Sequence, residues 1–530
     1  MDYDFVVVGA GSAGAVVAAR LSEDPTTQVL LLEAGGSHKD MAISTPGLVA
    51  TLWRGKHDWG FTTTPQEGLD GRTNYWPRGK VLGGSSCLNY MIYIRGHRAD
   101  YDGWRDLGNQ GWGYDEVLPY FLRAERNARL GGAYHGRTGP LDVTDIKEPA
   151  PIIRKMIEAG ANCLGVPIVE DLNTPEREGM SPYQMTIRDG QRCNTAMAYL
   201  EPAMRRSNLT VIPKALVDRV IIEDGRAVGV RYETGKGEHI ANATKEVILC
   251  GGALGSPSVL LRSGVGPADE LAALQIPCVK DLQGVGKNLQ DHLVSVVAHK
   301  VKDKAVLSVN KPSILYWLGR YLLNRGGPLA APGCQGGGFV KTTPDAPIPD
   351  LQFHFVATGT PDNPLDNINY EPKGRGCMIL PTLLYPKSVG ELTLTSKDPA
   401  ASPRIEPAYY RDPEDMETML RGVRLAQRMF AAPPLADSIG EPTTEASRPE
   451  LSDDAIVKDI RYWSSTLFHP VGTCKMGSDP MAVVDDQLRV HGIEGLRVAD
   501  ASIMPKIVGG NTNAPTIMIG EKASDLILNQ

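Results

Sequence analysis

A short glycine pattern near the start of the chain limits the folds that it can adopt. Residues 4–8 are rich in valine and predict a buried strand, which runs into the pattern GAGSAG at 9–14 and then a helical run at 15–22. A second apolar run at 29–32 ends at Glu33, 19 residues beyond Gly14. This spacing is typical of a βαβ unit that binds a dinucleotide pyrophosphate at the helix N-terminus and the ribose hydroxyls through the acidic side chain.

The acidic residue at the end of the second strand narrows the choice of nucleotide. Glu33, in place of an arginine, favours a ribose without a 2′-phosphate. FAD and NAD both satisfy this condition, and the N-terminal segment alone does not choose between them.

Later segments predict further strands of the same sheet, so the nucleotide-binding domain is discontinuous in sequence. These strands are expected at 209–212, 217–222, 227–232, 246–250 and 496–498. A closing apolar helix is expected at 514–528.

The middle of the chain predicts a second domain. Strands are expected at 351–356 and 390–394 and a helix at 414–429. A length of 530 residues also exceeds one compact core, since domains hold roughly 100–200 residues. We predict an α/β protein whose second, substrate-binding domain is built on an antiparallel sheet with helices. The nucleotide-binding domain is expected to comprise 1–145, 205–300 and 461–530, and the substrate-binding domain 146–204 and 301–460.

Charge and cysteine usage exclude several classes of protein. Lys and Arg total 55 against 62 Asp and Glu, a net charge of −7, so no basic field exists to attract a nucleic acid. The eight cysteines form no C-x-x-C pair, which favours reduced thiols in a cytoplasm over disulfides or a metal site. The apolar start follows Asp2 and Asp4 and does not resemble a signal peptide. No apolar stretch is long enough to span a membrane, whereas attachment to a membrane surface stays open.

Three groups of motifs together resemble the glucose-methanol-choline (GMC) oxidoreductases. The resemblance rests on GKVLGGSSCLNY at 79–90, on GALGSP at 252–257 with LLRSGVG at 260–266, and on the C-terminal pair FHPVGTCKMG at 468–477 and GGNTNAPT at 509–516. It covers essentially the whole chain and is closest to the bacterial choline-dehydrogenase-like and alkanol-dehydrogenase-like members.

The resemblance implies FAD as the cofactor, which makes the first domain an FAD-binding one. The implied cofactor-binding residues are Gly9, Gly11, Ser12, Ala13, Gly14, Glu33, Ala34, Val81, Gly84, Asn89, Tyr90, Met91, Val217, Asp500 and Ala501. Some relatives carry a histidine that is covalently linked to the flavin, and Leu88 stands at the matching position. We therefore expect non-covalent FAD.

The same resemblance assigns the catalytic pair to His469 and Asn513. An imidazole has a pKa suited to removing the hydroxyl proton of an alcohol near neutrality, so His469 is expected to be the general base for hydride transfer to flavin N5. An amide at Asn513 would hold the substrate oxygen. The expected reaction is oxidation of a primary alcohol, aliphatic or aryl, to the aldehyde, with oxygen or a quinone-type compound as electron acceptor.

The expected substrate pocket is apolar. Its candidate residues are Cys334, Phe353, His354 and Phe468, with the apolar helix predicted at 314–323. That helix could line a substrate channel, touch a membrane surface or be an ordinary core helix. Neither a cluster of carboxylates nor a set of convergent polar groups is evident, so a neutral apolar alcohol is expected in preference to choline or a sugar. The sequence gives no expectation for the oligomeric state.

Two alternatives to alcohol oxidation stay open. The segment around Cys334 also resembles the fatty acid photodecarboxylases of the same family, but their carboxylate-binding arginine is replaced around Phe353 and His354. The presence of His469 and the absence of that anchor favour alcohol oxidation. The other alternative is a flavin-binding protein without turnover, against which the intact His469 and Asn513 argue.

Overall fold

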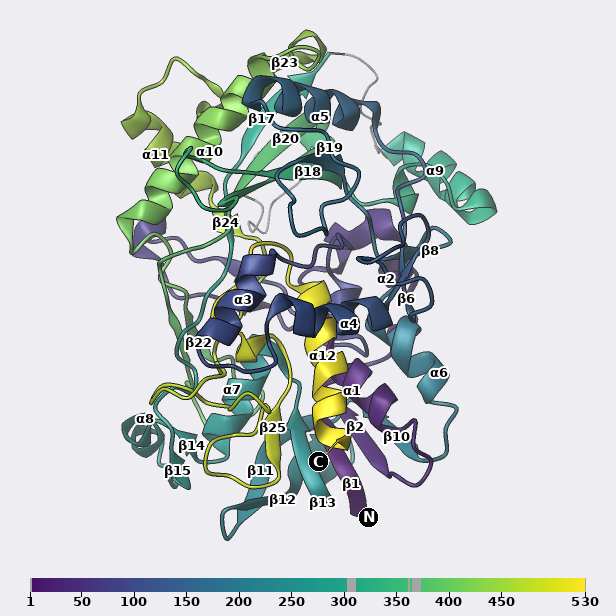
Figure 1. The fold of residues 1–530 in the computed structure, drawn as a ribbon, viewed down its shortest axis with the longest axis vertical. Coiled ribbons are helices and arrows are strands. Elements are labelled where there is room, and N and C mark those ends of the chain that lie inside the picture. Colours follow the sequence, from purple (N-terminus) through teal and green to yellow (C-terminus); the bar gives the residue numbers. More distant parts are fainter. Residues whose placement is uncertain (1, 303–310, 361–362, 365–372, 530) are drawn as a thin grey trace.

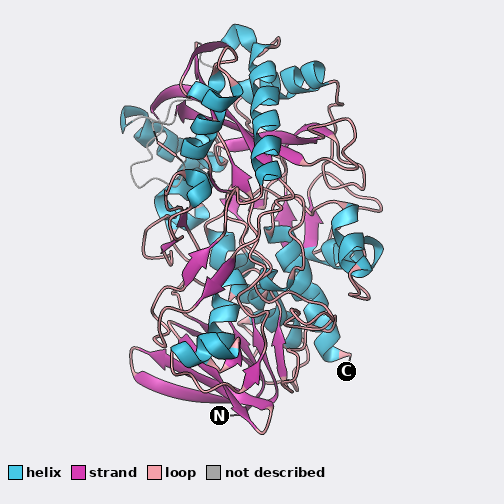
Figure 2. Ribbon diagram, turned by 90° about the vertical axis from the view of Figure 1, so that its left-hand side faces the viewer, coloured by secondary structure: helices cyan, strands magenta, loops and turns pink. Residues whose placement is uncertain are grey.

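The computed structural model describes residues 2–302, 311–360, 363–364 and 373–529. Its two large sheets lie at opposite ends of the long axis, with helices and long loops between and around them (Figures 1 and 2). The predicted α/β class, with a Rossmann-like part and a second part built on an antiparallel sheet, is confirmed. The exact division of the chain into domains stays a prediction.

The first sheet combines strands from distant parts of the sequence. Its order is β10-β2-β1-β13-β12-β11, and β25 also pairs with β13. The strands are β1 (Asp2–Val8), β2 (Val29–Glu33), β10 (Leu209–Pro213), β11 (Leu216–Glu223), β12 (Arg226–Thr234), β13 (Gly237–Leu249) and β25 (Leu496–Val498). The neighbours β10, β2, β1, β13 and β25 are parallel, and β2 is buried along its whole length. Burial on both faces explains why these strands read as unbroken apolar runs.

Helix α1 (Gly14–Leu21) begins at the glycine turn after β1 and packs against the C-terminal helix α12 (Asn513–Leu528). Helix α7 (Gly252–Arg262) follows β13 in the same way. Three helix N-termini are thus presented near the same end of the parallel strands, where open α/β sheets bind their ligands. Figure 1 shows α12 and α1 side by side next to the sheet.

The second sheet is antiparallel and has the order β23-β17-β20-β19-β18-β7, with β16 and β24 attached to it. Its strands are β7 (Gly179–Pro182), β16 (Leu293–Val294), β17 (Val297–Val301), β18 (Cys334–Val340), β19 (Leu351–Thr360), β20 (Lys373–Leu383), β23 (Ile439–Pro442) and β24 (Ser465–Thr466). Helices α5 (Pro151–Leu164) and α10 (Pro413–Ala431) pack on one face of this sheet, and α11 (Asp453–Trp463) packs on α10. The opposite face is turned toward the first sheet (Figure 1).

The remaining elements are short or peripheral. They include the helices α2 (Met41–Ser44), α3 (Arg98–Asp106), α4 (Tyr114–Ala124), α6 (Glu201–Ala203), α8 (Ala268–Ala273) and α9 (Lys311–Asn324), and the 3-10 turns η1 (Pro46–Leu52), η3 (Gly84–Cys87) and η5 (Pro328–Ala330). The short strands are β3 (Phe61–Thr62), β4 (Tyr75–Trp76), β5 (Glu125–Asn127), β6 (Leu141–Val143), β8 (Ile187–Arg188), β9 (Gln191–Arg192), β14 (Val265–Gly266), β15 (Lys280–Asp281), β21 (Glu391–Thr393) and β22 (Arg404–Glu406). The strand expected at 390–394 is β21, which pairs with β22 in a small sheet of its own.

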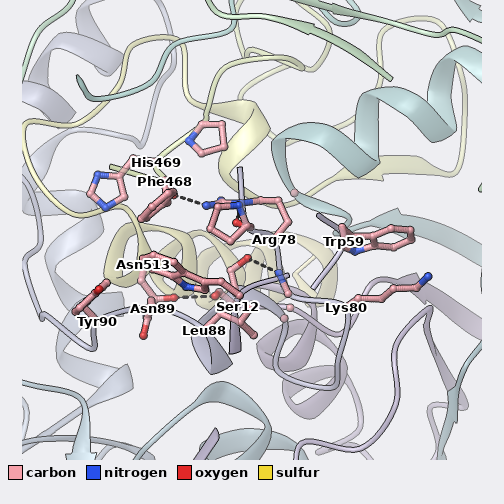
Figure 3. Close-up of a pocket in the computed structure, with 18 of the residues that line it drawn as sticks. Ser12, Trp59, Arg78, Lys80, Leu88, Asn89, Tyr90, Phe468, His469 and Asn513 are labelled. Atoms are coloured by element: carbon pink, nitrogen blue, oxygen red, sulfur yellow. Dashed lines mark hydrogen bonds between the residues drawn. The ribbon is translucent and has the colours of Figure 1, made fainter. Parts of the chain in front are cut away.

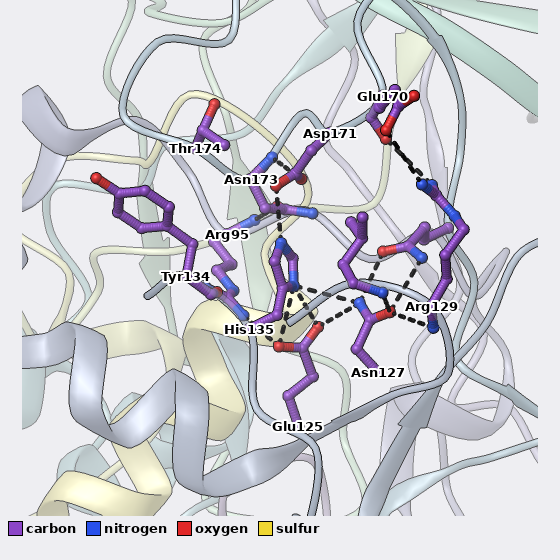
Figure 4. A network of polar contacts seen from close by, with 12 residues as sticks. Arg95, Glu125, Asn127, Arg129, Tyr134, His135, Glu170, Asp171, Asn173 and Thr174 are labelled. Atoms are coloured by element: carbon purple, nitrogen blue, oxygen red, sulfur yellow. Dashed lines mark hydrogen bonds and ion pairs between the residues drawn. The ribbon is translucent and has the colours of Figure 1, made fainter. Parts of the chain in front are cut away.

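A buried polar network ties the segment after α4 to the segment before β7 (Figure 4). The ring of His135 contacts Glu125 through Nδ1 at 3.0 Å and Asp171 through Nε2 at 2.8 Å. Arg95 forms a second ion pair with Glu125, at 2.5 Å. Although burial opposes ionisation, hydrogen bonds to Asp171 and Glu125 raise the pKa of His135, and the pKa values of both carboxyls are lowered.

No helix in the described part of the chain is long and apolar enough to cross a membrane. Within the same residues, no group of three or more His, Cys, Asp and Glu side chains is arranged to hold a metal ion.

Candidate active site

A cavity of about 1070 Å³ lies between the two sheets and is lined by residues of both. One end is formed by the glycine turn, Glu33 and Val217, and the other by His354 and Val356 of β19. Figure 3 shows part of it, with Ser12 beside Asn513 and His469 beside Phe468. Most of the sequence-predicted site residues line this single cavity: Gly9, Gly11, Ser12, Ala13, Glu33, Ala34, Gly84, Asn89, Tyr90, Met91, Val217, Cys334, His354, Phe468, His469, Asp500, Ala501 and Asn513.

Two glycine turns make the narrow floor of the cavity. Gly84 has a φ of +53°, and a Cβ there would lie 2.6 Å from the Cα of Gly11. A side chain at that position would therefore force the two turns apart. The close approach leaves backbone rather than side chains facing the cavity along this stretch, which suits a flat or extended ligand.

Three of the predicted residues lie outside the cavity lining. Gly14 packs α1 onto β1, because a Cβ there would overlap the carbonyl oxygen of Gly9 at 1.9 Å. Val81 is fully buried behind the cavity, in a bridge to Gly36. Phe353 points toward α10 and the other core side chains, since successive residues of β19 face opposite sides of the sheet and His354 takes the cavity side. The prediction of Phe353 as a pocket residue is therefore wrong.

Glu33 is held at the end of β2 by backbone donors. The amides of Ala10 and Gly35 donate to its two carboxylate oxygens at 2.9 and 2.7 Å. Burial raises its pKa to about 7, although both amide hydrogen bonds oppose this. Each oxygen keeps a lone pair for a hydroxyl donor in the cavity.

His469 is fixed from two sides. Its backbone amide donates to Oδ1 of the buried Asp291 at 2.8 Å, and its ring Nδ1 lies 2.9 Å from Nδ1 of His292. The other ring nitrogen of His292, Nε2, lies 3.0 Å from the carbonyl oxygen of Leu384. Because a carbonyl only accepts, Nε2 of His292 carries the proton.

This contact determines the tautomer of His469. Burial lowers the pKa of His292 to about 4, so it is neutral near pH 7 and its Nδ1 can only accept. Nδ1 of His469 must then donate to it, which leaves the lone pair of His469 on Nε2. Burial, with the neighbouring His292, His354 and Arg78, also lowers the pKa of His469 well below its usual value. His469 therefore presents an unprotonated Nε2 in the cavity.

Asn511, not Asn513, lies next to that nitrogen. Nδ2 of Asn511 is 3.4 Å from Nε2 of His469, and Nε2 of Gln352 is 3.4 Å from Oδ1 of Asn511, which orients the amide. The side chain of Asn513 instead accepts a hydrogen bond from Oγ of Ser12 at 2.7 Å. The geometry therefore places Asn511 beside His469, where the sequence analysis expected Asn513.

The part of the cavity lining that comes from the second sheet and from the segment just before His469 is mainly apolar. It includes Cys334, Val356, Met378, Leu380, Leu467 and Phe468, and Ile92 also lines the cavity. Trp53 lies edge-on to both Phe468 and Tyr90, with ring centroids 5.1 and 5.9 Å apart, an aromatic cluster that the sequence did not reveal. Among the described residues that line the cavity, the only acidic ones are Glu33 and Asp500, both on the side of the first sheet.

Comparison with known proteins agrees with this architecture. The model of the GMC oxidoreductase family matches residues 3–294 with its N-terminal part and 386–520 with its C-terminal part. The chain belongs to the GMC oxidoreductase family. It is an FAD-dependent oxidoreductase that acts on CH–OH donors.

Several relatives match this GMC oxidoreductase over nearly their whole lengths. An alcohol dehydrogenase (acceptor) of Pseudomonas putida is 41% identical over 100% of this chain and 96% of its own. The mitochondrial choline dehydrogenase of Mus musculus is 44% identical over 99% of this chain and 89% of its own. Among solved structures, pyridoxine 4-oxidase from Mesorbium loti superposes with a TM-score of 0.89 and 32% identity, covering 100% of this chain and 99% of that one.

Sequence reasoning missed several residues of the GMC oxidoreductase site. Asp291 and His292 belong to the motif NLQDH at 288–292, which carries an acidic residue beside a histidine and could have been noticed. Nothing in the sequence around Gln352, a polar residue in a mainly apolar strand, indicates a functional role. Asn511 stands in the quoted motif GGNTNAPT, two positions before Asn513, so only the geometry separates the two amides.

Proposed function

We propose that this GMC oxidoreductase oxidises a neutral, largely apolar primary alcohol, aliphatic or aryl, to the aldehyde. The observation that carries the proposal is the unprotonated Nε2 of His469 next to an apolar and aromatic wall that has no carboxylate among its described residues. The decarboxylase and the non-catalytic alternatives have no use for a base held in this way.

In the proposed mechanism, His469 removes the hydroxyl proton of the alcohol at Nε2. An alcohol is a very weak acid, and its carbon releases hydride readily only while that proton is being removed. The positive charge that develops on the His469 ring is shared with His292 through the contact between their Nδ1 atoms. Asp291, which holds the backbone of His469, keeps the ring in place.

Asn511 is proposed to hold the substrate oxygen. Its Nδ2 faces the same space as Nε2 of His469, so one oxygen atom can be contacted by both. Gln352 holds the acceptor end of the Asn511 amide, which leaves the donor end for the substrate. Positioning of this kind contributes to catalysis by fixing the reacting carbon.

The other end of the cavity fits FAD, which when bound supplies the acceptor for the hydride. Backbone at the glycine turn and the start of α1 suit the pyrophosphate, and Glu33 suits the ribose. Gly84 and residues 89–91 are proposed to face the flavin ring, as is the first turn of α12 with Asn513. Val217, Asp500 and Ala501 are proposed to contact the remainder of the cofactor, and Leu88, which lines the cavity without a nucleophile, supports non-covalent binding.

The aromatic cluster bears on the choice between alcohols. Trp53, Tyr90 and Phe468 could face an aryl ring or a quaternary ammonium. A cation also gains from a carboxylate, and the described wall on this side offers none. Together these features favour benzyl-type and medium-chain alcohols over choline, and over sugars, which require several convergent polar groups.

Anaerobic reduction of the flavin tests the proposal. The holoenzyme is mixed with benzyl alcohol, 1-octanol, ethanol, choline or glucose, and bleaching of the flavin absorbance is followed. We expect benzyl alcohol and 1-octanol to reduce it at the lowest concentrations, because each methylene buried contributes about 0.8 kcal/mol. A preference for choline or glucose would contradict the pocket assignment, and no bleaching by any alcohol would contradict the function. Reoxidation by oxygen or by a soluble quinone then identifies the acceptor.

A further inference from the structure

Helix α9 turns an apolar face to solvent. Leu315, Tyr316, Leu322 and Leu323 are 75%, 65%, 57% and 89% exposed. Their spacing places all four on one side of the helix. Helix α9 lies at the right-hand edge of the molecule in Figure 1. A surface helix normally exposes a polar side, whereas α9 exposes these four residues while it also buries Tyr321 on its inner side.

The orientation is fixed by contacts on the inner side of α9. The hydroxyl of Tyr321 is buried and donates to the carbonyl of Gly190 at 3.1 Å. The ring of Trp317 packs on Gly327, where an added Cβ would lie 3.1 Å from it, and Arg320 pairs with Glu148 at 2.7 Å. Rolling the apolar face inward would break these contacts. No residue from 315 to 323 lines the cavity, so these residues do not form a substrate channel, one of the three roles considered for this helix. The side chain of Ile314 lies outside the described residues.

The charge near this face is positive in a chain of net charge −7. The part of the segment 311–326 whose side chains the structure describes, 315–326, contains Arg320 and Arg325 and no acidic residue. Glu148, the acidic group that faces α9 from the neighbouring segment, is already paired with Arg320. Apolar and aromatic side chains flanked by basic ones are the pattern of a helix that lies in a membrane interface, where basic groups meet lipid phosphates.

The position of α9 relative to the cavity agrees with such a role. The turn η5 (Pro328–Ala330) follows α9 directly and packs on η1 (Pro46–Leu52), and both turns line the cavity. The exposed apolar face is therefore only a few residues along the chain from the cavity wall.

From the exposed face, its fixed orientation and its charge, we propose that α9 docks this enzyme on the surface of a phospholipid bilayer with anionic headgroups. Leu315, Tyr316, Leu322 and Leu323 would enter the boundary between headgroups and acyl chains. Arg320 and Arg325, at the edges of this face, would contact phosphates. The proposal does not depend on which alcohol is oxidised.

Flotation with vesicles tests the proposal. The purified holoenzyme is mixed with vesicles of equal parts phosphatidylcholine and phosphatidylglycerol and separated on a density gradient. We expect the wild type to float and the double variant Leu315→Gln/Leu323→Gln to bind at least about tenfold more weakly, because binding scales with the apolar area buried. Vesicles of phosphatidylcholine alone, and added salt, should also weaken wild-type binding.

A matched control and a second measurement separate docking from misfolding. Ile240→Gln replaces a residue that is 62% exposed on β13, far from α9 along the fold, and should float as the wild type does. All variants should keep bound FAD and the wild-type rate with ethanol. The proposal is overturned if the wild type does not float or if the double variant floats equally well. It is also overturned if light scattering without vesicles shows that the double substitution dissociates a dimer, since α9 would then be a contact between copies.

Discussion

The Nδ1 atoms of His292 and His469 lie 2.9 Å apart, and the carbonyl of Leu384 on the far side of His292 decides which of them carries the proton. The backbone oxygen of Leu384 thereby sets the protonation of the His469 ring, which it reaches through His292. This relationship predicts different outcomes for two substitutions of His292. His292→Asn keeps an acceptor for Nδ1 of His469, whereas His292→Leu removes it.

We expect His292→Leu to slow flavin reduction about tenfold or more, because a lost orienting hydrogen bond of about 1 kcal/mol and a wrong tautomer both oppose the base. His292→Asn should recover part of that rate. Stopped-flow reduction across pH, with FAD content as a control for folding, measures both. Equal rates in the two variants would mean that the contact does not set the tautomer.

His469→Ala should fold and retain FAD but lose most alcohol oxidation, since removal of a general base costs about 10²–10⁴-fold. The loss should fall on the rate of flavin reduction, measured anaerobically with the best alcohol. Reduction at the wild-type rate would show that another group removes the proton.

The two asparagines of the C-terminal motif should separate in their effects. Asn511→Ala is expected to slow flavin reduction roughly tenfold or more, because the substrate oxygen loses a donor where water is excluded. Asn513→Ala removes the contact with Ser12 and should chiefly weaken retention of FAD. Measuring reduction rate and flavin content in both variants distinguishes the assignments, and the opposite pattern would restore Asn513 to the catalytic pair.

The flavin should leave the protein on denaturation. Leu88 lines the cavity where a linking histidine would stand, and it has no nucleophilic atom. Acid precipitation should therefore release all the yellow colour into the supernatant. Absorbance that stays with the washed pellet would refute non-covalent binding.

The network around His135 should make stability depend on pH. The folded-state pKa of His135 is raised above its ordinary 6.5, so its contribution is complete below that value and is lost as pH rises through the raised pKa. Glu125 and Asp171 have lowered pKa values, so their contributions are present above their ordinary 4.5 and 3.8 and are lost in acid. The network therefore stabilises the fold most between about pH 4.5 and 6.5.

Substitution of His135 isolates this contribution. His135→Gln should cost roughly 1–3 kcal/mol of unfolding free energy near pH 6 and less near pH 9. Denaturant titrations of both proteins at the two pH values measure the difference. A cost that did not change with pH would show that His135 acts as a neutral hydrogen-bonding group.

Local patterns account for what could be predicted from the sequence. The βαβ unit, the strands of the first sheet and the closing helix rest on periodicity and on turn residues a few positions apart. Phe353 and His354 show the limit of prediction from local patterns. These two neighbours in a strand face opposite sides of the sheet, and only the packing of the whole sheet decides which side faces the cavity. The same holds for His292 and Trp53, which reach His469 and Phe468 from distant segments, and for the exposed side of α9, which periodicity finds but cannot orient.

The hydrogen bond between Ser12 and Asn513 joins residues 501 positions apart. Arg20 and Glu521, from the same two helices, are equally distant in sequence and form a bidentate pair. Strand β25 (Leu496–Val498) pairs with β13 (Gly237–Leu249) and is synthesised long after it. The nucleotide-binding core is therefore completed only after a segment 501 residues beyond the glycine turn has been synthesised. Until that segment is present, β13 lacks its neighbour β25 and α1 lacks its neighbour α12, so apolar surface that the folded protein buries stays exposed to aggregation.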